Sequence, residues 1–399
     1  MPASVAAGQG QMGTPNPSGA GGGGQNPFWV ASNLYAEKIS TLTQQLSAAI
    51  PNFFQLVNPG NFMRGIRFLV RTSTPGVTAG TTAQDNPFNS IYSLDLENVD
   101  GGEIMYPMGG WAYAVSQAMF RPWCIAPWSA YDFAANTLTP SYSIFLQPEI
   151  RQTACVLSNT DARSQYKYNI FLNSNAAIGG ATTAPFLTVT SYLDAWAQPD
   201  PNDLQGTPNQ PLPPGLALQL KRRHQAGVTF QSGGSDNILQ LTNTGNALRG
   251  IVAVVRDSSN NRRNIATDPI RWQQDNRNLG VFSPDLLSQW YQSQLSEYAA
   301  ADTYLNNQGT YQGAGTATLF AGGPAGETLQ AYPEGCYPFL RYWNPGVLTG
   351  QGWLYTTNAT KLTLETASLA ASSGNCTVEF ITDEVYPVMP TVPADLQEI

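Results

Sequence analysis

Hydrophobic and polar residues alternate in many short segments of this chain, and the pattern predicts an all-β fold. Ile91 to Leu96 (IYSLDL) alternates with a period of two, and Gly65 to Thr72 (GIRFLVRT) has the apolar run of a buried strand. Further strands are expected at residues 141–146, 154–157, 165–172 and 185–190, and in the second half at 238–241, 250–256, 339–343, 353–357, 361–365 and 377–382. Because regularly alternating long helices are missing, these strands indicate a sandwich or jelly roll and not a parallel sheet.

Three segments have a helical pattern instead. Ser32 to Ile50 is predicted to be an amphipathic helix, because its apolar residues keep approximate helical spacing behind possible caps. Residues 109–120 (GGWAYAVSQAMF) could form a second helix that interrupts the first set of strands. Ser283 opens a third helix, expected to run to about Ala301, since a proline and an acidic residue follow the serine.

Twenty residues of the chain recur without a gap. Phe54 to Ser73 (FQLVNPGNFMRGIRFLVRTS) matches Leu239 to Ser258 (LQLTNTGNALRGIVAVVRDS) at 11 of 20 positions, at an offset of 185 residues. A period this long indicates a duplicated domain, since solenoid and propeller repeats are roughly 20 to 50 residues long. We therefore expect two tandem eight-stranded jelly rolls, at residues 50–212 and 213–388.

The remaining segments are expected to flank or link these domains. Residues 1–27 carry no charged side chain and are rich in Gly, Pro and Ser, so a flexible arm is predicted there, and with the helix it occupies residues 1–49. The Pro-rich stretch 198–215 is the expected linker, and residues 389–399 form a C-terminal tail. Without a recognisable secretory signal or a long apolar run, synthesis as a soluble cytoplasmic protein is expected.

The composition indicates a protein that contacts other proteins. Charged residues make up 12% of the chain, against about 25% in a typical soluble protein. Only four of the 19 basic residues are lysines, whereas Tyr, Phe and Trp number 18, 16 and 9. Protein interfaces are depleted in Lys and enriched in Arg and aromatic residues, so much of the surface is interpreted as contact surface.

The charge argues against direct binding of nucleic acid. The formal net charge is −8, whereas neutralising phosphates requires a clustered excess of Lys and Arg. The two basic runs, Lys221 to His224 and Arg262-Arg263, are short and are interpreted as solvated faces.

Candidate catalytic chemistry is scarce. His224 is the one histidine, and the H-E-x-x-H, G-x-S-x-G and P-loop motifs are absent from the sequence. Two G-x-G-x-x-G matches lie in the glycine-rich arm, where neither follows a strand. The four cysteines are far apart and are expected to be free buried thiols. We therefore expect no enzyme, and we assign no catalytic, cofactor-binding or metal-binding residue.

Two other groups of polar residues have a structural and a functional interpretation. Asp95, Glu97, Asp100 and Glu103 could hold a calcium ion, but a solvated turn is favoured because their spacing is not that of an EF-hand. The repeated arginines, Arg64 with Arg249 and Arg71 with Arg256, are expected to share a structural role, such as bonding loop carbonyls or carboxylates.

Six segments carry a resemblance to a known family. They are Arg64 to Val70, Ser90 to Tyr92, Gly109 to Trp111, Gln152 to Phe171, Ser191 to Asp194 and Asn246 to Val255. In this order, and with the duplication and the composition, they resemble the double jelly-roll major capsid proteins of tectivirus-type bacteriophages, which are icosahedral and contain a membrane. The similarity spans roughly residues 50–388 and is thin between these segments. The glycine-rich arm departs from the family, whose N-terminal segment is generally helical.

The resemblance implies a structural protein of the virion. It implies homotrimers whose six jelly rolls form a pseudo-hexagonal block, and these trimers would tile an icosahedral shell over an internal membrane. The implied partners are neighbouring capsomers, penton proteins and minor capsid proteins. In this picture the helix at Ser32 to Ile50, with Phe28 and Trp29 before it, lies near the membrane or bridges to a neighbour.

Two alternatives remain open at this point. An acidic, aromatic and Asn-rich β-sandwich is also typical of secreted or surface proteins that bind carbohydrate, or of glycoside hydrolases with a pair of carboxylates. The protein could also be a spike or minor capsid protein, which would keep its location in the virion and change its copy number.

Overall fold

A computed structural model describes much of the first predicted domain and half of the second. The described residues are 28–46, 52–72, 85, 88–98, 100–120, 141–150, 155–163, 165–178, 184–200, 211–213, 219–230, 237–242, 245–260, 262, 267–283, 286, 335–341, 352–367 and 376–386. The predicted arm (1–27), residues 201–210 and 214–215 of the Pro-rich linker, and the C-terminal tail lie outside the described residues.

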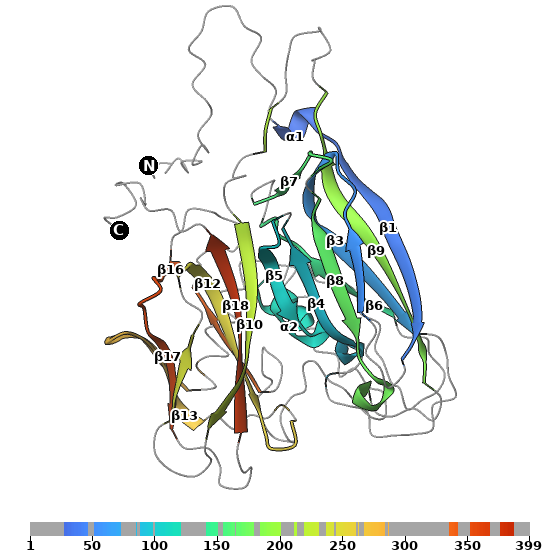
Figure 1. The fold of residues 1–399 in the computed structure, drawn as a ribbon. Coiled ribbons are helices and arrows are strands. Elements are labelled where there is room, and N and C mark those ends of the chain that lie inside the picture. The colour runs from blue at the N-terminus through green and yellow to red at the C-terminus, as the bar shows by residue number, and fades with distance from the viewer. Residues whose placement is uncertain are drawn as a thin grey trace, which may run out of the picture.

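The first half of the chain folds into two facing antiparallel sheets (Figure 1). One sheet contains, in spatial order, β1 (Leu34–Gln45), β9 (Phe186–Ala197), β3 (Asn61–Thr72) and β6 (Ser141–Leu146), and β7 (Leu157–Asn159) continues the β6 edge along β3. The other contains β5 (Glu103–Met108), β4 (Ile91–Glu97), β8 (Lys167–Leu172) and β2 (Asn52–Leu56). With β6 and β7 on one edge of β3, the described strands occupy eight sheet positions, as a jelly roll requires.

The second half repeats this strand order. Its first sheet contains β10 (Gln219–Phe230), β18 (Cys376–Tyr386), β12 (Ala247–Arg256) and β15 (Cys336–Leu340), and β16 (Leu354–Tyr355) continues the β15 edge. Its second sheet contains β14 (Arg277–Phe282), β13 (Thr267–Gln274), β17 (Leu362–Ala367) and β11 (Asn237–Leu241). The all-β double jelly roll expected from the sequence is therefore confirmed.

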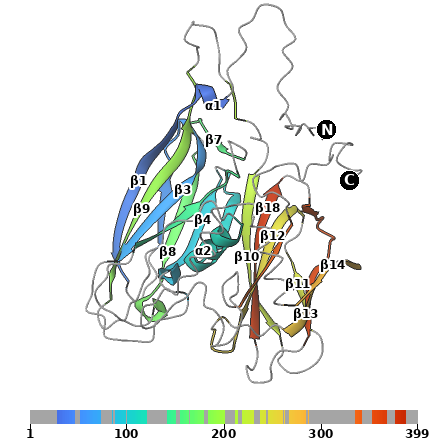
Figure 2. The ribbon, with the colours of Figure 1, turned by 180° about the vertical axis from the view of Figure 1, so that it is seen from behind.

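One sheet runs through both rolls. β10 of the second roll lies parallel to β5 of the first, with Arg222 opposite Met105. The sheet of β5, β4, β8 and β2 in the first roll therefore joins the β10 sheet of the second roll, and together they form one nine-stranded sheet. The other connections in this sheet are antiparallel. The two rolls thus stand side by side with a shared sheet between them (Figures 1 and 2).

The prediction of a helix over Ser32 to Ile50 is wrong. Residues 34–45 form β1, which pairs along its length with β9, and the α-helix before it, α1, spans only Phe28–Ala31. The spacing of Leu34, Ile39 and Leu42 fits either structure, and pairing with a strand about 150 residues later overrides local propensity. β1 therefore belongs to the first roll, and Phe28 packs within the fold against Phe62 and Trp196 instead of facing a membrane or a neighbour.

The other predicted helices have different outcomes. Residues 110–120 form α2 (Gly110–Phe120), as the sequence suggests. For the segment that begins at Ser283, the serine Oγ accepts a hydrogen bond of 3.1 Å from Leu286 N, as a helix cap does, and Leu286 is helical. Residues 287–301 lie outside the described residues. Two short 3₁₀ turns, Phe88–Ser90 and Asn175–Ile178, complete the described helical segments.

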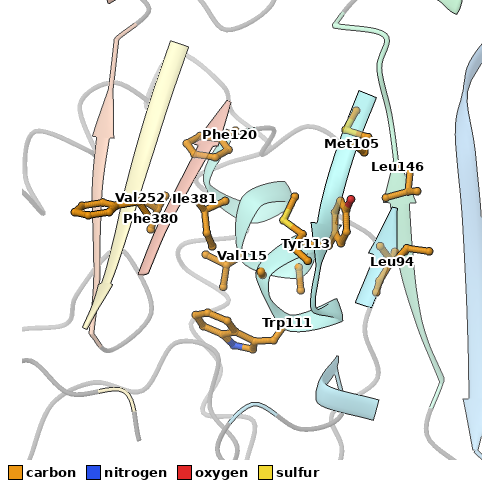
Figure 3. Packing of buried hydrophobic residues seen from close by; sticks show 14 of the residues in the cluster. Leu94, Met105, Trp111, Tyr113, Val115, Phe120, Leu146, Val252, Phe380 and Ile381 are labelled. Atoms are coloured by element: carbon orange, nitrogen blue, oxygen red, sulfur yellow. The ribbon is translucent and has the colours of Figure 1, made fainter. Parts of the chain in front are cut away.

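α2 lies between the two rolls, and most of its residues are apolar, as is typical of a buried helix. Every described side chain from Trp111 to Gln117 is buried, as is Phe120. Figure 3 shows α2 with the second roll on one side and the first roll on the other. The labelled neighbours are Val252, Phe380 and Ile381 of the second roll and Leu94, Met105 and Leu146 of the first. The cores of both rolls form one continuous apolar cluster.

Candidate functional site

The junction between the rolls contains charged side chains of both rolls in direct contact. Asp85 of the first roll bonds two arginines of the second: Arg256 Nη2 lies 2.9 Å from Asp85 Oδ2, and Arg262 Nε lies 2.8 Å from Asp85 Oδ1. Both guanidinium groups also lie over the ring of Trp111 on α2, at 4.8 and 4.9 Å from its centre. These four residues, which we call the junction cluster, join the two rolls through charge and ring contacts.

The second roll orients the junction cluster through Glu379. Its Oε1 lies 2.6 Å from Arg256 Nε, and its Oε2 lies 3.1 Å from His224 Nε2. Burial alone would raise the pKa of Glu379, but the hydrogen bond with His224 and the charge of Arg256 hold it below its usual value. Burial likewise opposes the charge of Arg256, yet Asp85 and Glu379 outweigh it and raise its pKa. Arg256 and Glu379 are therefore both ionised at neutral pH.

A second buried ionic group lies beside it on β10, β12 and β18. Asp383 lies between Arg249, whose Nη1 is 3.1 Å from Asp383 Oδ2, and Arg222, whose Nε is 3.5 Å from Asp383 Oδ1. All three side chains are completely buried. Arg222 Nη1 also donates to Ser116 Oγ on α2 at 3.0 Å, and the Arg223 guanidinium lies 4.7 Å from the ring centre of Tyr106 on β5. This group, too, connects the second roll to the first.

The basic run at Lys221 to His224 is therefore not a solvated face. Arg222 is fully buried, the side chain of Arg223 is 17% exposed, and His224 bonds Glu379. The same correction applies to Arg262, which is fully buried at the junction, while Arg263 lies outside the described residues. The partners that neutralise these charges come from β18 and from Asp85, which lie far from the run in sequence.

The repeated arginines have a shared structural role at one of the two positions, as predicted. Arg64 and Arg249 each sit at a β-bulge, where β3 and β12 shift register against β9 and β18. Arg64 Nη1 lies 3.3 Å from Asp194 on β9, which matches the contact of Arg249 with Asp383 on β18. Arg64 also lies 2.5 Å from Glu149, whose other oxygen accepts a bond from the Trp196 indole.

The second repeated pair does not share a role. Arg71 is exposed at the end of β3, whereas its equivalent Arg256 is buried in the junction cluster. The duplication therefore preserved the bulge and its ion pair, and only the second copy uses the later arginine to hold the two rolls together.

The acidic cluster lies on β4, on β5 and, for Asp100, in the turn between them. Asp95 accepts hydrogen bonds from Asn169 N and Nδ2, and Glu97 Oε2 lies 2.7 Å from Lys167 Nζ. Burial raises the pKa of Asp95 to about 6, against the opposing effect of its bonds with Asn169. Within the described residues, no group of three or more His, Cys, Asp or Glu side chains is arranged to hold a metal ion. Asp95 is buried, and its partner is an asparagine, so the favoured interpretation as a solvated turn is wrong for this residue.

The other candidate residues are structural where they are described. Cys155, Cys336 and Cys376 are buried, as predicted, and burial raises the pKa of Cys336 to about 12. Cys124 and both G-x-G-x-x-G matches lie outside the described residues. Among the described helices, none combines the length and the hydrophobicity that crossing a bilayer would need. The sequence does not predict the junction because Asp85 gives no pattern signal, and Arg262 lies in a basic run that is typical of a solvated face.

Several solved structures share this arrangement of rolls. A chain from the atomic structure of Sulfolobus Turreted Icosahedral Virus has a TM-score of 0.59 and 12% sequence identity, covering 91% of this chain and 95% of its own. A chain of the PBCV-1 virus capsid has a TM-score of 0.55 at 10% identity, covering 89% and 94%. The major capsid protein of Bacteriophage PM2 has a TM-score of 0.50 at 9% identity, covering 89% and 98%. This chain is thus similar in fold to double jelly-roll proteins along nearly its whole length.

Sequence comparison adds no closer relative. No protein-family model matches the chain, and no curated protein shows significant sequence similarity to it.

Proposed function

We propose that this chain is the major structural subunit of a viral capsid, not an enzyme, and that it acts by assembling with copies of itself. The proposal is supported by a fold shared across about nine-tenths of the chain with capsid proteins of three viruses. The observation that carries it is the pair of similarly built rolls held by a buried ionic junction. A duplicated roll adds a second copy of the same contact surfaces to one rigid block.

The proposed assembly is a homotrimer with a pseudo-hexagonal outline. Three chains that each carry two similar rolls imitate six-fold symmetry, while the differences between the rolls distinguish one neighbour from another. Such blocks would tile an icosahedral shell over an internal membrane, in contact with penton and minor capsid proteins. The protein would be located in the virion after synthesis in the host cytoplasm.

The test is a deletion whose boundary the structure sets. Removing residues 1–50 would delete β1, so the informative variant removes only residues 1–27. We expect this variant to form soluble trimers that do not complete shells, because the predicted arm would reach neighbouring blocks or the membrane. Light scattering reports the trimer, and electron microscopy of particles reports the shell.

The control is the full chain carried through the same preparation. Quantification in purified particles should find it as the most abundant protein of the shell. A full chain that stays monomeric and binds glycans, or that is present in only a few copies per particle, would contradict the proposal.

A further inference from the structure

β1 and β14 are two of the edge strands that have no described partner on their outer side; the others are β2, β6, β7, β11, β15 and β16. β1 is the last strand of the first sheet of the first roll, and β14 is the last strand of the second sheet of the second roll. Both are open to solvent, since Ala36, Glu37 and Lys38 on β1 and Arg277 and Asn278 on β14 are exposed. They lie on opposite sides of the molecule (Figure 2). An open strand edge is a template for pairing with another chain.

The same two kinds of edge are already joined inside the chain. By strand order and register, β10 is the second-roll equivalent of β1: Ala36 pairs with Asp194 as Arg222 pairs with Asp383. In the same way β14 is the equivalent of β5. β5 is the last of the four first-roll strands and pairs with β4, and β14 is the last strand of its sheet and pairs with β13. The junction of the rolls is the parallel contact of β5 with β10. The open pair, β14 and β1, therefore repeats the closed pair.

We propose that β14 of one chain lies parallel to β1 of a second copy of this chain, repeating between chains the contact that β5 and β10 make within one. This inference rests on the proposed function and names the surface by which the trimer forms. The contact is head-to-tail, so its repetition produces a ring when the rotation closes. Three chains supply three internal and three external junctions, and each external junction extends a four-stranded sheet of one copy into the sheet of the next.

Charge distinguishes the external junction from the internal one. Inside the chain, Arg223 on β10 lies near Glu103, the first residue of β5. Burial and Glu97 raise the pKa of Glu103, and the positive charge of Arg223 opposes that rise. On the open edges the signs are exchanged, because Glu37 occupies the position of Arg223 and Arg277 is the first residue of β14. Arg277 also lies close enough to Arg341 to help lower the pKa of Arg341, after the larger effect of burial, so two arginines lie near each other here. Arg277 on β14 would attract Glu37 on β1 of a second copy and repel Arg223 on β10, so the charges favour the proposed pairing over the alternative one.

The chain also places similar elements after the two strands. α2 follows β5 directly and seals the internal junction against β12 and β18. After β14, Ser283 caps a turn in which Leu286 is helical and 48% exposed. The described start of this segment is thus at the position where α2 starts in the first roll, which supports the equivalence of the two edges.

The test is a charge exchange in the full-length chain. At low ionic strength we expect Glu37→Arg and Arg277→Glu each to weaken trimer formation by about tenfold, because each places like charges in every external junction. The double variant restores opposite charges and should return to within about threefold of the unaltered chain. Mass photometry over a dilution series measures the trimer fraction, and a thermal melt confirms that each variant is folded.

Matched controls come from a part of the first roll away from both edges. Asp161→Arg and Arg163→Glu change the same charges at exposed positions between β7 and β8 and should leave the trimer unchanged. If the unaltered chain is a trimer but the single variants behave like these controls, or the double variant does not recover, the edge contact is wrong and the capsid proposal stands. If the unaltered chain is monomeric at every concentration, both are overturned.

Discussion

Replacing Asp383 with alanine is expected to destabilise the protein by about 3 to 5 kcal/mol, because it leaves two buried arginines without the carboxylate between them. Arg222 and Arg249 are both fully buried, so bulk solvent cannot replace the lost carboxylate. Denaturation by urea at a fixed protein concentration measures the change in the free energy of unfolding. Because Arg222 also bonds Ser116 on α2, the junction between the rolls should loosen in the same variant.

The duplication provides a matched comparison for this substitution. Asp194 is the first-roll equivalent of Asp383, but its side chain is 16% exposed, and Arg64 keeps Glu149 as a second partner. Asp194→Ala should therefore cost only about 1 kcal/mol. If both variants lose the same free energy of unfolding, the depth of burial does not determine the strength of the Arg–Asp pair, and the explanation for Asp383 is wrong.

The second large effect is expected from Gly65→Ala, with a cost of about 3 kcal/mol. Gly65 follows the bulge at Arg64, and a β-carbon there would fall on the carbonyl oxygen of Leu146 and lie 2.9 Å from the Cα of Gln147. These are backbone atoms of the neighbouring chain segment, so they can yield only if β3 and β6 separate. Urea denaturation again provides the measurement.

Gly109→Ala is the control for this prediction. A β-carbon at Gly109 would have its nearest contact at 3.4 Å, from the carbonyl oxygen of Tyr92, which is an ordinary van der Waals distance. We expect its cost to stay below that of Gly65→Ala by at least about 2 kcal/mol. A tolerated Gly65→Ala would mean that the bulge is not tightly packed against β6.

The repeat explains how much of the fold was accessible from the sequence. Its arginine and glycine pair, at positions 64–65 and 249–250, lies at a bulge in both rolls, and the ion pair beside it was expected as a structural role. The residue pattern predicts most of the strands, and β8 and β9 show the alternation of buried and less buried residues that it expects. These features depend on residues that are close in the sequence, so the pattern contains them.

The features that were missed depend on distant partners. The buried Arg222 is indistinguishable in the sequence from a solvated basic residue, because Asp383 lies about 160 residues away. The strand β1 was taken for a helix because β9 decides its conformation. Even the repeat is not followed exactly, since Phe54 is 68% exposed while its equivalent Leu239 is buried. The inward-facing positions of β2 and β11 differ by one residue, so equivalent side chains of the repeat point to opposite faces of the sheet. No local sequence pattern predicts this difference.

The central claim is that this chain works by assembling with itself. The most direct test is the mass of the purified full-length protein in solution, measured by light scattering across a dilution series. The account predicts a species of three times the 43.0 kDa of the chain that persists on dilution. A protein that remains at 43.0 kDa at every concentration would contradict it.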